Sequence, residues 1–331
     1  MDATHHAAPA GGHGGPASNV PERLLRSALL SMAHQRWLGR LATSAPVTRP
    51  MVRRFVAGQT LDEALGAVTA LRDRGFATSV DVLGESVTGT AAAASAADRY
   101  LAVMDALAER GLERNVSLKL TQMGLDLGHD VCLETAGRVV RHAASMGAFV
   151  RVDMEDHTRT DATLAVVRAL RRAHPDTGVV IQAALRRSAA DVEALIEEGC
   201  PVRLCKGAYK EPTSVAFADK ADVDRNYAAL MERLLLAGRR PALATHDPRL
   251  IGRAVEIAER EGIARDRFEF QMLYGVRRDL QDRLVAAGYG VRVYVPFGTE
   301  WYPYFMRRLA ERPANVAFIL RSLTREQAGA H

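Results

Sequence analysis

Short β-rich runs alternate with longer helical stretches along most of this 331-residue chain. The eight runs are Ser79–Leu83, Val116–Leu120, Phe149–Met154, Val179–Ala183, Val202–Cys205, Ala242–Thr245, Phe268–Met272 and Val291–Val295. The helical stretches, with apolar residues at helical spacing, are Ala92–Ala108, Cys132–Ser145, Ala162–Ala173, Ala189–Glu198, Arg225–Ala237, Arg249–Glu261 and Arg278–Ala287. This alternation predicts an α/β fold, a closed (β/α)8 TIM-type barrel, which typically needs about 250 residues.

An open, doubly wound sheet is the alternative for a chain with this alternation. Such a sheet usually carries a glycine-rich GxGxxG turn directly after its first strand. The turn after the first run here reads Leu83-Gly84-Glu85-Ser86, which lacks that pattern. We therefore favour the closed barrel over the open sheet.

The chain divides into three parts by composition and pattern. Residues 1–20 consist mainly of Gly, Ala, His and Pro, and we expect a disordered tail because such a segment cannot offset the entropy of ordering. Residues 21–75 show helical patterns, around Val52–Phe55 and over Leu61–Arg74, and are predicted to form an N-terminal helical segment. Residues 76–325 are predicted to form the catalytic barrel.

The composition argues against several classes of protein. The three cysteines, Cys132, Cys200 and Cys205, have no paired spacing, which disfavours a disulfide framework or a structural zinc site and fits a reducing cytosol. No apolar run approaches the ~18–20 residues of a membrane span, and the N-terminus lacks the basic and apolar regions of a signal peptide. We therefore expect a cytoplasmic protein without a metal site.

The net charge of +5 at pH 7 is carried mostly by arginine pairs scattered along the chain. A basic surface can attract nucleic acid or an anionic membrane. No helix-turn-helix, RNP or zinc-finger signature accompanies the charge. We interpret it as a solvated, Arg-rich surface and expect no nucleic-acid partner.

Polar residues collect at the carboxyl ends of the eight runs, where barrel enzymes carry their chemistry. They include Asp81, Glu85, Lys119, Asp153, Gln182, Arg203, Lys206, Tyr209, Thr245, His246, Gln271 and Tyr294. A buried charge is costly unless it has a partner or a ligand. A single charge is readily explained by a structural ion pair, such as Lys119 with Asp153 or Arg203 with Glu85. Polar groups at one end of all eight runs are harder to explain by structure alone.

The cations at these ends exceed the acids that could neutralise them. Lys119, Arg203 and Lys206 stand against Asp153 and Glu85. Strand parity leaves open whether Arg203 faces the barrel interior or the helices. An excess of positive charge at the mouth suits an anion, whether a carboxylate, a phosphate or an electron-rich cofactor.

A second polar group follows the eighth run, in the segment TEWYPYFMRRLAERPANVAF. Tyr304, Arg307, Arg308 and Glu311 fall on neighbouring turns of one predicted helix. Tandem arginines can bind a substrate carboxylate with paired hydrogen bonds. On spacing alone, an exposed charged face with an Arg308–Glu311 pair is the favoured interpretation.

Several motifs together resemble one known family. RLCKGAYKEP and YFMRRLAERPAN, with SVDVLGE, SLKLTQMG, VRVDMED, ATHD, FQMLYG and VRVYVPFG, strongly resemble proline dehydrogenase, from about Val80 to about Asn315. The chain resembles the stand-alone bacterial enzyme, without the aldehyde dehydrogenase or DNA-binding parts of the fused forms.

The resemblance implies a distorted barrel that holds FAD non-covalently, with the last helix over the barrel mouth. It implies oxidation of L-proline to Δ1-pyrroline-5-carboxylate by hydride transfer from C5 to the flavin. The electrons would then pass to a quinone, in the first step of proline catabolism. Quinone use implies visits to the membrane surface, so the expected location is the cytoplasm with peripheral contact at the inner membrane. The oligomeric state stays open.

The resemblance also assigns roles to individual residues. Substrate ligands would be Lys119, Arg307 and Arg308 at the carboxylate, and Tyr209, Leu273, Tyr294 and Tyr304 around the pyrrolidine ring. Cofactor ligands would be Gln182, Arg203, Lys206, Gly207, Ala208, Thr245, His246 and Glu311. The catalytic residues would be Asp153 and Arg203. Asp153 would orient Lys119 and is the only nearby acid that could assist a proton, and Arg203 would lie near the flavin N5.

Other functions remain open at this point. The same fold could act on 4-hydroxyproline or another cyclic amino acid, although family members that prefer hydroxyproline lack a tyrosine at the position of Tyr294. A Schiff-base aldolase with Lys119 or Lys206 as nucleophile is a different class. A non-catalytic barrel that only binds flavin or anions is disfavoured by the dense ring of polar groups.

Overall fold

The structure is a computed structural model that describes residues 48–311, and side chains within residues 52–308. The predicted tail, residues 1–20, lies outside the described residues. So do residues 21–47 of the predicted helical segment and residues 312–325 of the predicted barrel range.

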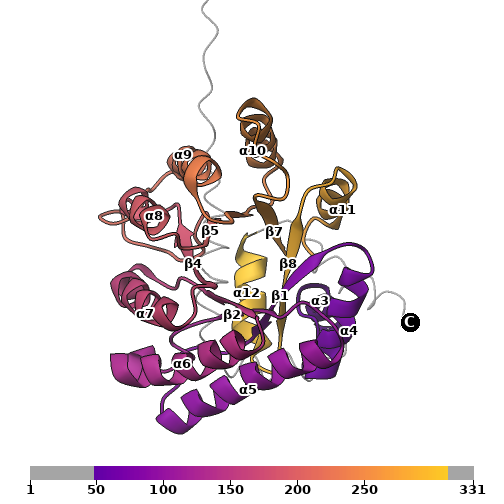
Figure 1. Ribbon diagram of the computed structural model, residues 1–331, viewed down its shortest axis with the longest axis vertical. Helices are drawn as coiled ribbons and strands as arrows, with labels where there is room; N and C mark the ends of the chain where they lie inside the picture. The colour runs from indigo at the N-terminus through magenta and orange to yellow at the C-terminus, as the bar shows by residue number, and fades with distance from the viewer. Residues whose placement is uncertain (1–47, 312–331) are drawn as a thin grey trace, which may run out of the picture.

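Eight parallel strands form a closed barrel and pair in the order of the chain, with β8 returning to β1. They are β1 (Ala77–Val82), β2 (Asn115–Leu118), β3 (Phe149–Val152), β4 (Thr177–Gln182), β5 (Val202–Cys205), β6 (Ala242–Ala244), β7 (Glu269–Leu273) and β8 (Val291–Phe297). Each overlaps one of the predicted runs. The predicted (β/α)8 barrel is therefore confirmed (Figure 1).

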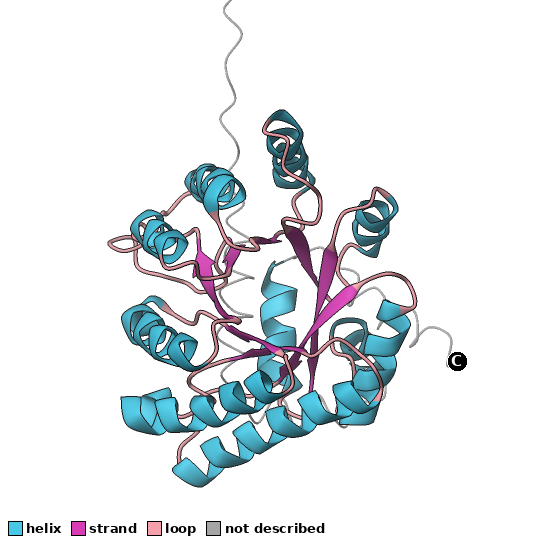
Figure 2. Cartoon of the chain, viewed as in Figure 1, coloured by secondary structure: helices cyan, strands magenta, loops and turns pink. Residues whose placement is uncertain are grey.

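Helices surround the strands on the outside (Figure 2). The helices between strands are α5 (Thr90–Glu109), α6 (His129–Ser145), α7 (Thr160–Ala173), α8 (Ser188–Glu197), α9 (Lys220–Ala237), α10 (Pro248–Arg260) and α11 (Arg278–Ala286). Short 3-10 turns, η1 (Leu125–Leu127) and η2 (His157–Arg159), lie before α6 and α7. Before β1 come α3 (Thr48–Phe55) and α4 (Leu61–Arg72), and α12 (Trp301–Glu311) follows β8.

Local signals explain where several helices begin. Thr60 caps α4 and forms a capping box with Glu63, so two otherwise unpaired backbone N–H groups are satisfied. Asp247 caps α10, and Pro248 occupies its first turn, where the missing N–H costs nothing. The cap at Asp247 fixes where α10 begins after β6, and so fixes one strand-to-helix loop at the barrel mouth.

Alternate residues of each strand face two different environments. On β8, Val291, Val293 and Val295 are buried in the main hydrophobic core between strands and helices. Arg292 and Tyr294, between those valines, line cavities at the two ends of the barrel. The hydrophobic core therefore lies outside the barrel, and the barrel interior is free to carry polar groups.

A second hydrophobic cluster fixes α12 across the barrel. It joins α3 to α12 and consists of Val52, Phe55, Val56, Leu83, Trp301, Tyr304, Phe305 and Met306. The Phe55 and Phe305 rings lie 6.2 Å apart. In Figure 1, α12 lies over the centre of the ring of strands. The expected final helix over the barrel mouth is thus present, and α3 supports it.

The turn after β7 holds α3 through a close backbone contact. Gly275 has a φ of 72°, in the left-handed region that disfavours side chains. A Cβ atom at this position would lie 1.6 Å from the carbonyl oxygen of Arg54 on α3. Only glycine allows this approach, so Gly275 links β7 to the helix that supports α12.

We expect Gly275→Ala to lower the free energy of unfolding by more than about 2 kcal/mol, because it adds both backbone strain and a clash with α3. Urea unfolding of the purified protein measures the change. Gly252→Ala on α10 is the control, since a Cβ there meets no atom within 4 Å. It should raise the stability by about 0.5–1 kcal/mol. Equal effects of the two substitutions would contradict the proposed contact.

Candidate active site

A cavity of about 620 Å³ lies at the carboxyl end of the barrel, beneath α12. The predicted residues that line it are Lys119, Asp153, Gln182, Arg203, Lys206, Gly207, Ala208, Tyr209, Thr245, His246, Leu273, Tyr294, Tyr304, Arg307 and Arg308. The structure therefore brings all but one of the predicted site residues together. The exception is Glu311, which ends α12 and whose side chain lies outside the described residues.

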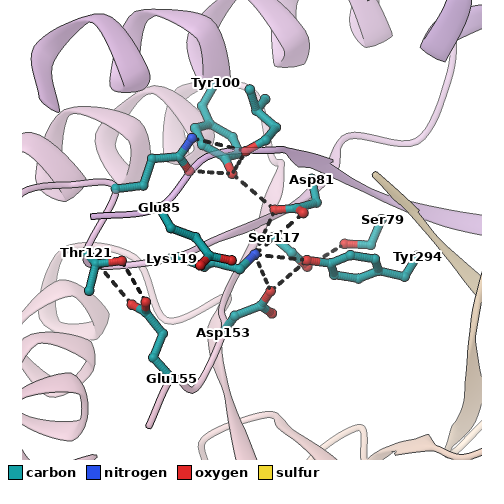
Figure 3. Close-up of polar contacts among 12 residues, drawn as sticks. Ser79, Asp81, Glu85, Tyr100, Ser117, Lys119, Thr121, Asp153, Glu155 and Tyr294 are labelled. Carbon is teal, nitrogen blue, oxygen red and sulfur yellow. Dashed lines mark hydrogen bonds and ion pairs between the residues drawn. The ribbon is translucent and has the colours of Figure 1, made fainter. Parts of the chain in front are cut away.

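Lys119 is the centre of a buried polar network just after β2, shown in Figure 3. Its Nζ lies 3.3 Å from Asp81 Oδ1, 3.4 Å from Asp153 Oδ2 and 3.4 Å from the Tyr294 hydroxyl. The Tyr294 hydroxyl donates to Asp153 Oδ2 at 2.7 Å. Burial disfavours the charged form of Lys119. The pKa of Lys119 is nevertheless raised well above its usual value, because Asp81, Tyr294 and Asp153 lie close to the ammonium group. Lys119 therefore stays cationic.

Asp81 is a member of this network that sequence reasoning did not place in the site. Its side chain is fully buried on β1, and it shares Lys119 with Asp153. Asp153 is therefore not the only acid beside Lys119, and its expected role in assisting a proton stays a prediction. Strand parity was the signal that could have placed Asp81, because residues two apart on a strand face the same side. Asp81 lies two residues after Ser79, which faces the barrel interior and hydrogen bonds to Ser117 at 2.8 Å.

Arg203 points into the barrel, which settles the question that strand parity left open. Its Nη1 donates to Asp153 Oδ1 at 2.8 Å, and its Nη2 donates to Ser117 Oγ at 2.9 Å. Its Nε donates to Gln271, and its guanidinium lies 5.3 Å from the Tyr294 ring centroid. The acid paired with Arg203 is thus Asp153, and the alternative pairing with Glu85 is wrong.

Glu85 instead pairs with Arg307 on α12. Burial disfavours the charged form of Arg307, but the neighbouring Glu85 carboxylate raises the pKa of Arg307 above its usual value. The neighbouring Arg308 lies with its guanidinium 5.1 Å from the Tyr304 ring centroid. Both arginines line the cavity, so the predicted exposed charged face does not describe this helix.

The outer part of the cavity has its own contacts. The Nζ of Lys206 lies 2.5 Å from Asp224 Oδ1 and 3.2 Å from Asp247 Oδ2. The sequence suggested that the charge of Lys206 had no acid to neutralise it, and these two ion pairs show that it has. Gly207 has a φ of 114°, and a Cβ there would lie 3.0 Å from Ala184. The backbone conformation alone therefore requires glycine at this position.

Two further predicted cofactor ligands are held by backbone groups. Gln182 donates through Nε2 to the carbonyl of Glu155 at 2.8 Å, which leaves its Oε1 available as an acceptor. His246 accepts through Nε2 from the N–H of Leu273 at 2.9 Å. Accepting at Nε2 places the ring proton on Nδ1, because a neutral imidazole has one donor and one acceptor.

The lining has more basic than acidic side chains. It contains Lys119, Arg203, Lys206, Lys220, Arg277, Arg307 and Arg308 against the acids Asp153 and Asp247. Met154, Val180, Ala244, Met272 and Leu273 add apolar surface. A cavity with an apolar wall and many cationic donors suits a ligand that combines a ring system with negative groups.

Within residues 48–311, no helix combines the length and apolar character of a membrane span. In the same range, no cluster of His, Cys, Asp and Glu side chains could hold a metal ion.

The fold and the cavity define a barrel enzyme with a positively charged mouth. The sequence model described as proline dehydrogenase matches residues 64–321, and the chain therefore belongs to the proline dehydrogenase family. It is an oxidoreductase of this family, with an activity that requires a redox cofactor.

Named relatives support the same family along nearly the whole chain. The chain is 41% identical to proline dehydrogenase of Deinococcus radiodurans over 307 residues, 91% of this chain and 98% of the relative. It is 39% identical to proline dehydrogenase 1 of Bacillus subtilis strain 168, over 92% of this chain and the full length of the relative. Proline dehydrogenase 2 of that strain is 37% identical, with 92% and 97% covered.

Solved structures show the same fold in longer proteins. Proline utilization A of Bdellovibrio bacteriovorus, inactivated by N-propargylglycine, has a TM-score of 0.75 at 27% identity and covers 87% of this chain. A Bradyrhizobium japonicum proline utilization A mutant, D778Y, has a TM-score of 0.66 at 25% identity and covers 81%. This chain spans 36% and 31% of these two proteins, about a third of each.

We expect Asp153→Asn to lower the free energy of unfolding by about 3–5 kcal/mol, because Lys119 and Arg203 lose the acid that they share. Urea unfolding measures the change. Asp130→Asn is the control, because its carboxylate is fully exposed and its loss should change stability by no more than about 0.5 kcal/mol. An Asp153→Asn protein as stable as the control would show that the network does not depend on this acid.

Proposed function

We propose that the chain binds FAD non-covalently and oxidises L-proline to Δ1-pyrroline-5-carboxylate. One observation carries the proposal. The buried Lys119–Asp153–Arg203 network and the two arginines of α12 line the same cavity. Family membership supports proline as the substrate, and the cavity supplies positive charge for its carboxylate.

The donor set of the cavity fits FAD. Lys206, Gly207 and Ala208 follow β5 and would lie against the phosphates and ribose, with Thr245 and His246 beside them. The positive φ of Gly207 favours glycine, so no side chain at this position would obstruct the phosphates. Gln182 and Arg203 would contact the isoalloxazine ring. When bound, FAD would supply the two-electron acceptor for the hydride that leaves proline C5.

Arg203 would also assist catalysis through its charge. Its guanidinium is buried in the barrel and held by Asp153, Ser117 and Gln271, so its position is fixed before the reaction. A preorganised cation stabilises negative charge that develops in the transition state more effectively than water does. The fixed charge of Arg203 supports a catalytic role for this residue in addition to a structural one.

The substrate carboxylate would bind between Lys119, Arg307 and Arg308. Arg307 is paired with Glu85, so a carboxylate that binds Arg307 competes with that acid. Tyr209, Leu273, Tyr294 and Tyr304 line the same cavity and would surround the pyrrolidine ring. Hydride loss from C5 requires the amine lone pair, so the rate should rise as the bound amine loses its proton.

Two lysines that could serve a Schiff-base mechanism are poorly suited to it. A nucleophilic lysine needs a lowered pKa, yet the pKa of Lys119 is raised by its acidic neighbours. Lys206 is held between Asp224 and Asp247. These contacts argue against an aldolase reaction. The hydroxyl of Tyr294 contacts both Lys119 and Asp153, which holds this side chain in the cavity wall, where it would leave less room for a ring with an added hydroxyl group than for proline.

The electrons would leave to a quinone, and we propose that the protein visits the inner face of the membrane to deliver them. Support comes from the net charge of +5, because basic residues are attracted to anionic lipid. In this proposal the protein is otherwise cytoplasmic.

We expect the purified protein to be yellow, and its visible absorbance to bleach when L-proline is added without oxygen. An anaerobic spectrum before and after the addition tests flavin binding and substrate oxidation together. Turnover of 4-hydroxyproline in the same assay should be slower. A colourless protein, or a yellow protein that neither substrate bleaches, would overturn the proposed function.

We expect Arg307→Met and Arg308→Met each to raise KM for proline by at least about tenfold, because each removes a charge-assisted contact to the carboxylate. Flavin content, read from the absorbance ratio, should stay unchanged. Arg172→Met, at an exposed position near the end of α7, is the control and should leave KM unchanged. Normal kinetics in both α12 variants would contradict the assigned carboxylate site.

A further inference from the structure

A second cavity of about 210 Å³ lies at the opposite, amino-terminal end of the barrel. Its lining comes from the first residues of several strands, among them Asn115 of β2, Phe149 of β3 and Glu269 of β7, and from the residues just before β5 and β6. None of these residues lines the cavity beneath α12. The lower cavity is therefore separate from the candidate active site.

The lower cavity is built around a buried arginine. Arg151 is only 3% exposed, and its Nη1 donates to the carbonyls of Val179 and Pro201 at 3.2 and 2.6 Å. A Cβ at Gly178 would lie 2.5 Å from that Nη1, so glycine makes room for the guanidinium. Its Nε is buried without a hydrogen-bond partner among the described residues. An unpaired donor on a buried cation is costly, so a ligand that supplied an acceptor here would be stabilising.

Two further arginines add charge that the described residues do not neutralise well. Arg240 lies 3.7 Å from Asp176, an acid that Arg239 already binds at 2.6 Å. Within residues 48–311, the Arg267 side chain makes no hydrogen bond or ion pair, and it lines the cavity. The guanidinium groups of Arg151 and Arg240 lie 4.8 and 5.5 Å from the centroid of the same ring, Phe149. Two cations thus gather on one ring.

Arg292 differs from these three because its charge is satisfied. It donates to Glu269 at 2.8 Å and to Glu113 at 2.8 Å. Glu113 and Asp176, which pair with Arg292 and Arg240, lie just outside the lining, so the charges left without an ion pair among the described residues are those of Arg151 and Arg267. Burial and the neighbouring Arg203 lower the pKa of Arg151, and an anion at this site would relieve that repulsion.

An unused acceptor lies beside these unused donors. The side-chain oxygen of Asn115 is buried and has no partner among the described residues. A simple anion would satisfy Arg151 but leave Asn115 unpaired. A molecule that carries both a carboxylate and a hydrogen-bond donor satisfies both groups. The volume of the cavity is smaller than that of a typical cofactor site and leaves room for only a few carbon atoms.

We propose that the lower cavity binds a small amino or hydroxy acid, with its carboxylate at Arg151, Arg240 and Arg267 and its donor group at Asn115. The arginines supply paired, charge-assisted hydrogen bonds to the carboxylate. Arg240 and Arg267 are exposed, whereas Arg151 and Asn115 are buried, so the first two would meet the ligand nearer to solvent. This site needs no contribution from the residues of the active site, so it does not rest on the proposed reaction.

Isothermal titration of the full chain with L-glutamate, at constant ionic strength, tests the proposal. Arg267→Ala and Arg240→Ala should each weaken binding by at least about fivefold, because each removes a charge-assisted contact. Arg99→Ala, at an exposed position on α5 outside the lining, changes the net charge equally and should bind as the unchanged chain does. Glutarate, the same dicarboxylate without the amino group, should bind at least about fivefold more weakly than glutamate.

A second set of variants separates the two cavities. The double variant Arg307→Met with Arg308→Met should keep glutamate binding, because the lower cavity is intact. Loss of binding in that variant would place glutamate beneath α12 and overturn the proposal. So would unchanged binding in both Arg240→Ala and Arg267→Ala, or no binding of glutamate or L-malate up to about 10 mM, a concentration at which even weak contacts are detected. Equal binding of glutarate would overturn the role of Asn115.

Discussion

A charged lysine inside a closed barrel is the interaction on which the candidate active site depends. Removing an ion from water costs several kcal/mol unless partners compensate, and Lys119 finds them in Asp81, Asp153 and Tyr294. These partners come from β1, from the end of β3 and from β8. Strands β1 and β8 are more than two hundred residues apart in the chain and meet only because the barrel closes. The network therefore exists only in the complete fold.

The polar interior continues through the barrel as a chain of side chains. Asp153 accepts from Arg203, Arg203 donates to Gln271, and Gln271 donates to Glu269. Glu269 in turn accepts from Arg292 at the amino-terminal end. Each group in this chain satisfies the next, so substitutions within it should combine non-additively.

The sequence predicted the fold closely because its signals are local. Alternating runs of β-branched and helical residues require no knowledge of distant contacts, and each of the eight expected strands is present. The site was harder to predict because its pairs are long-range. Glu85 was a candidate partner of Arg203, yet it pairs with Arg307, which is 222 residues away. Lys206 seemed unpaired because one of its acids, Asp224, lies on a helix rather than at a strand end. Asp81 looked like one more polar strand residue.

The alternation along each strand separates two kinds of constraint on the sequence. On β8, Val291 and Val293 pack into the shared hydrophobic core, whereas Arg292 and Tyr294 contribute to polar sites in the barrel. A change on the inward side can thus alter chemistry while the packing that stabilises the chain stays the same. Evolution could therefore give this barrel new substrates by replacing inward residues of a strand while the hydrophobic core stays the same, provided that the buried charges beside each new side chain keep partners.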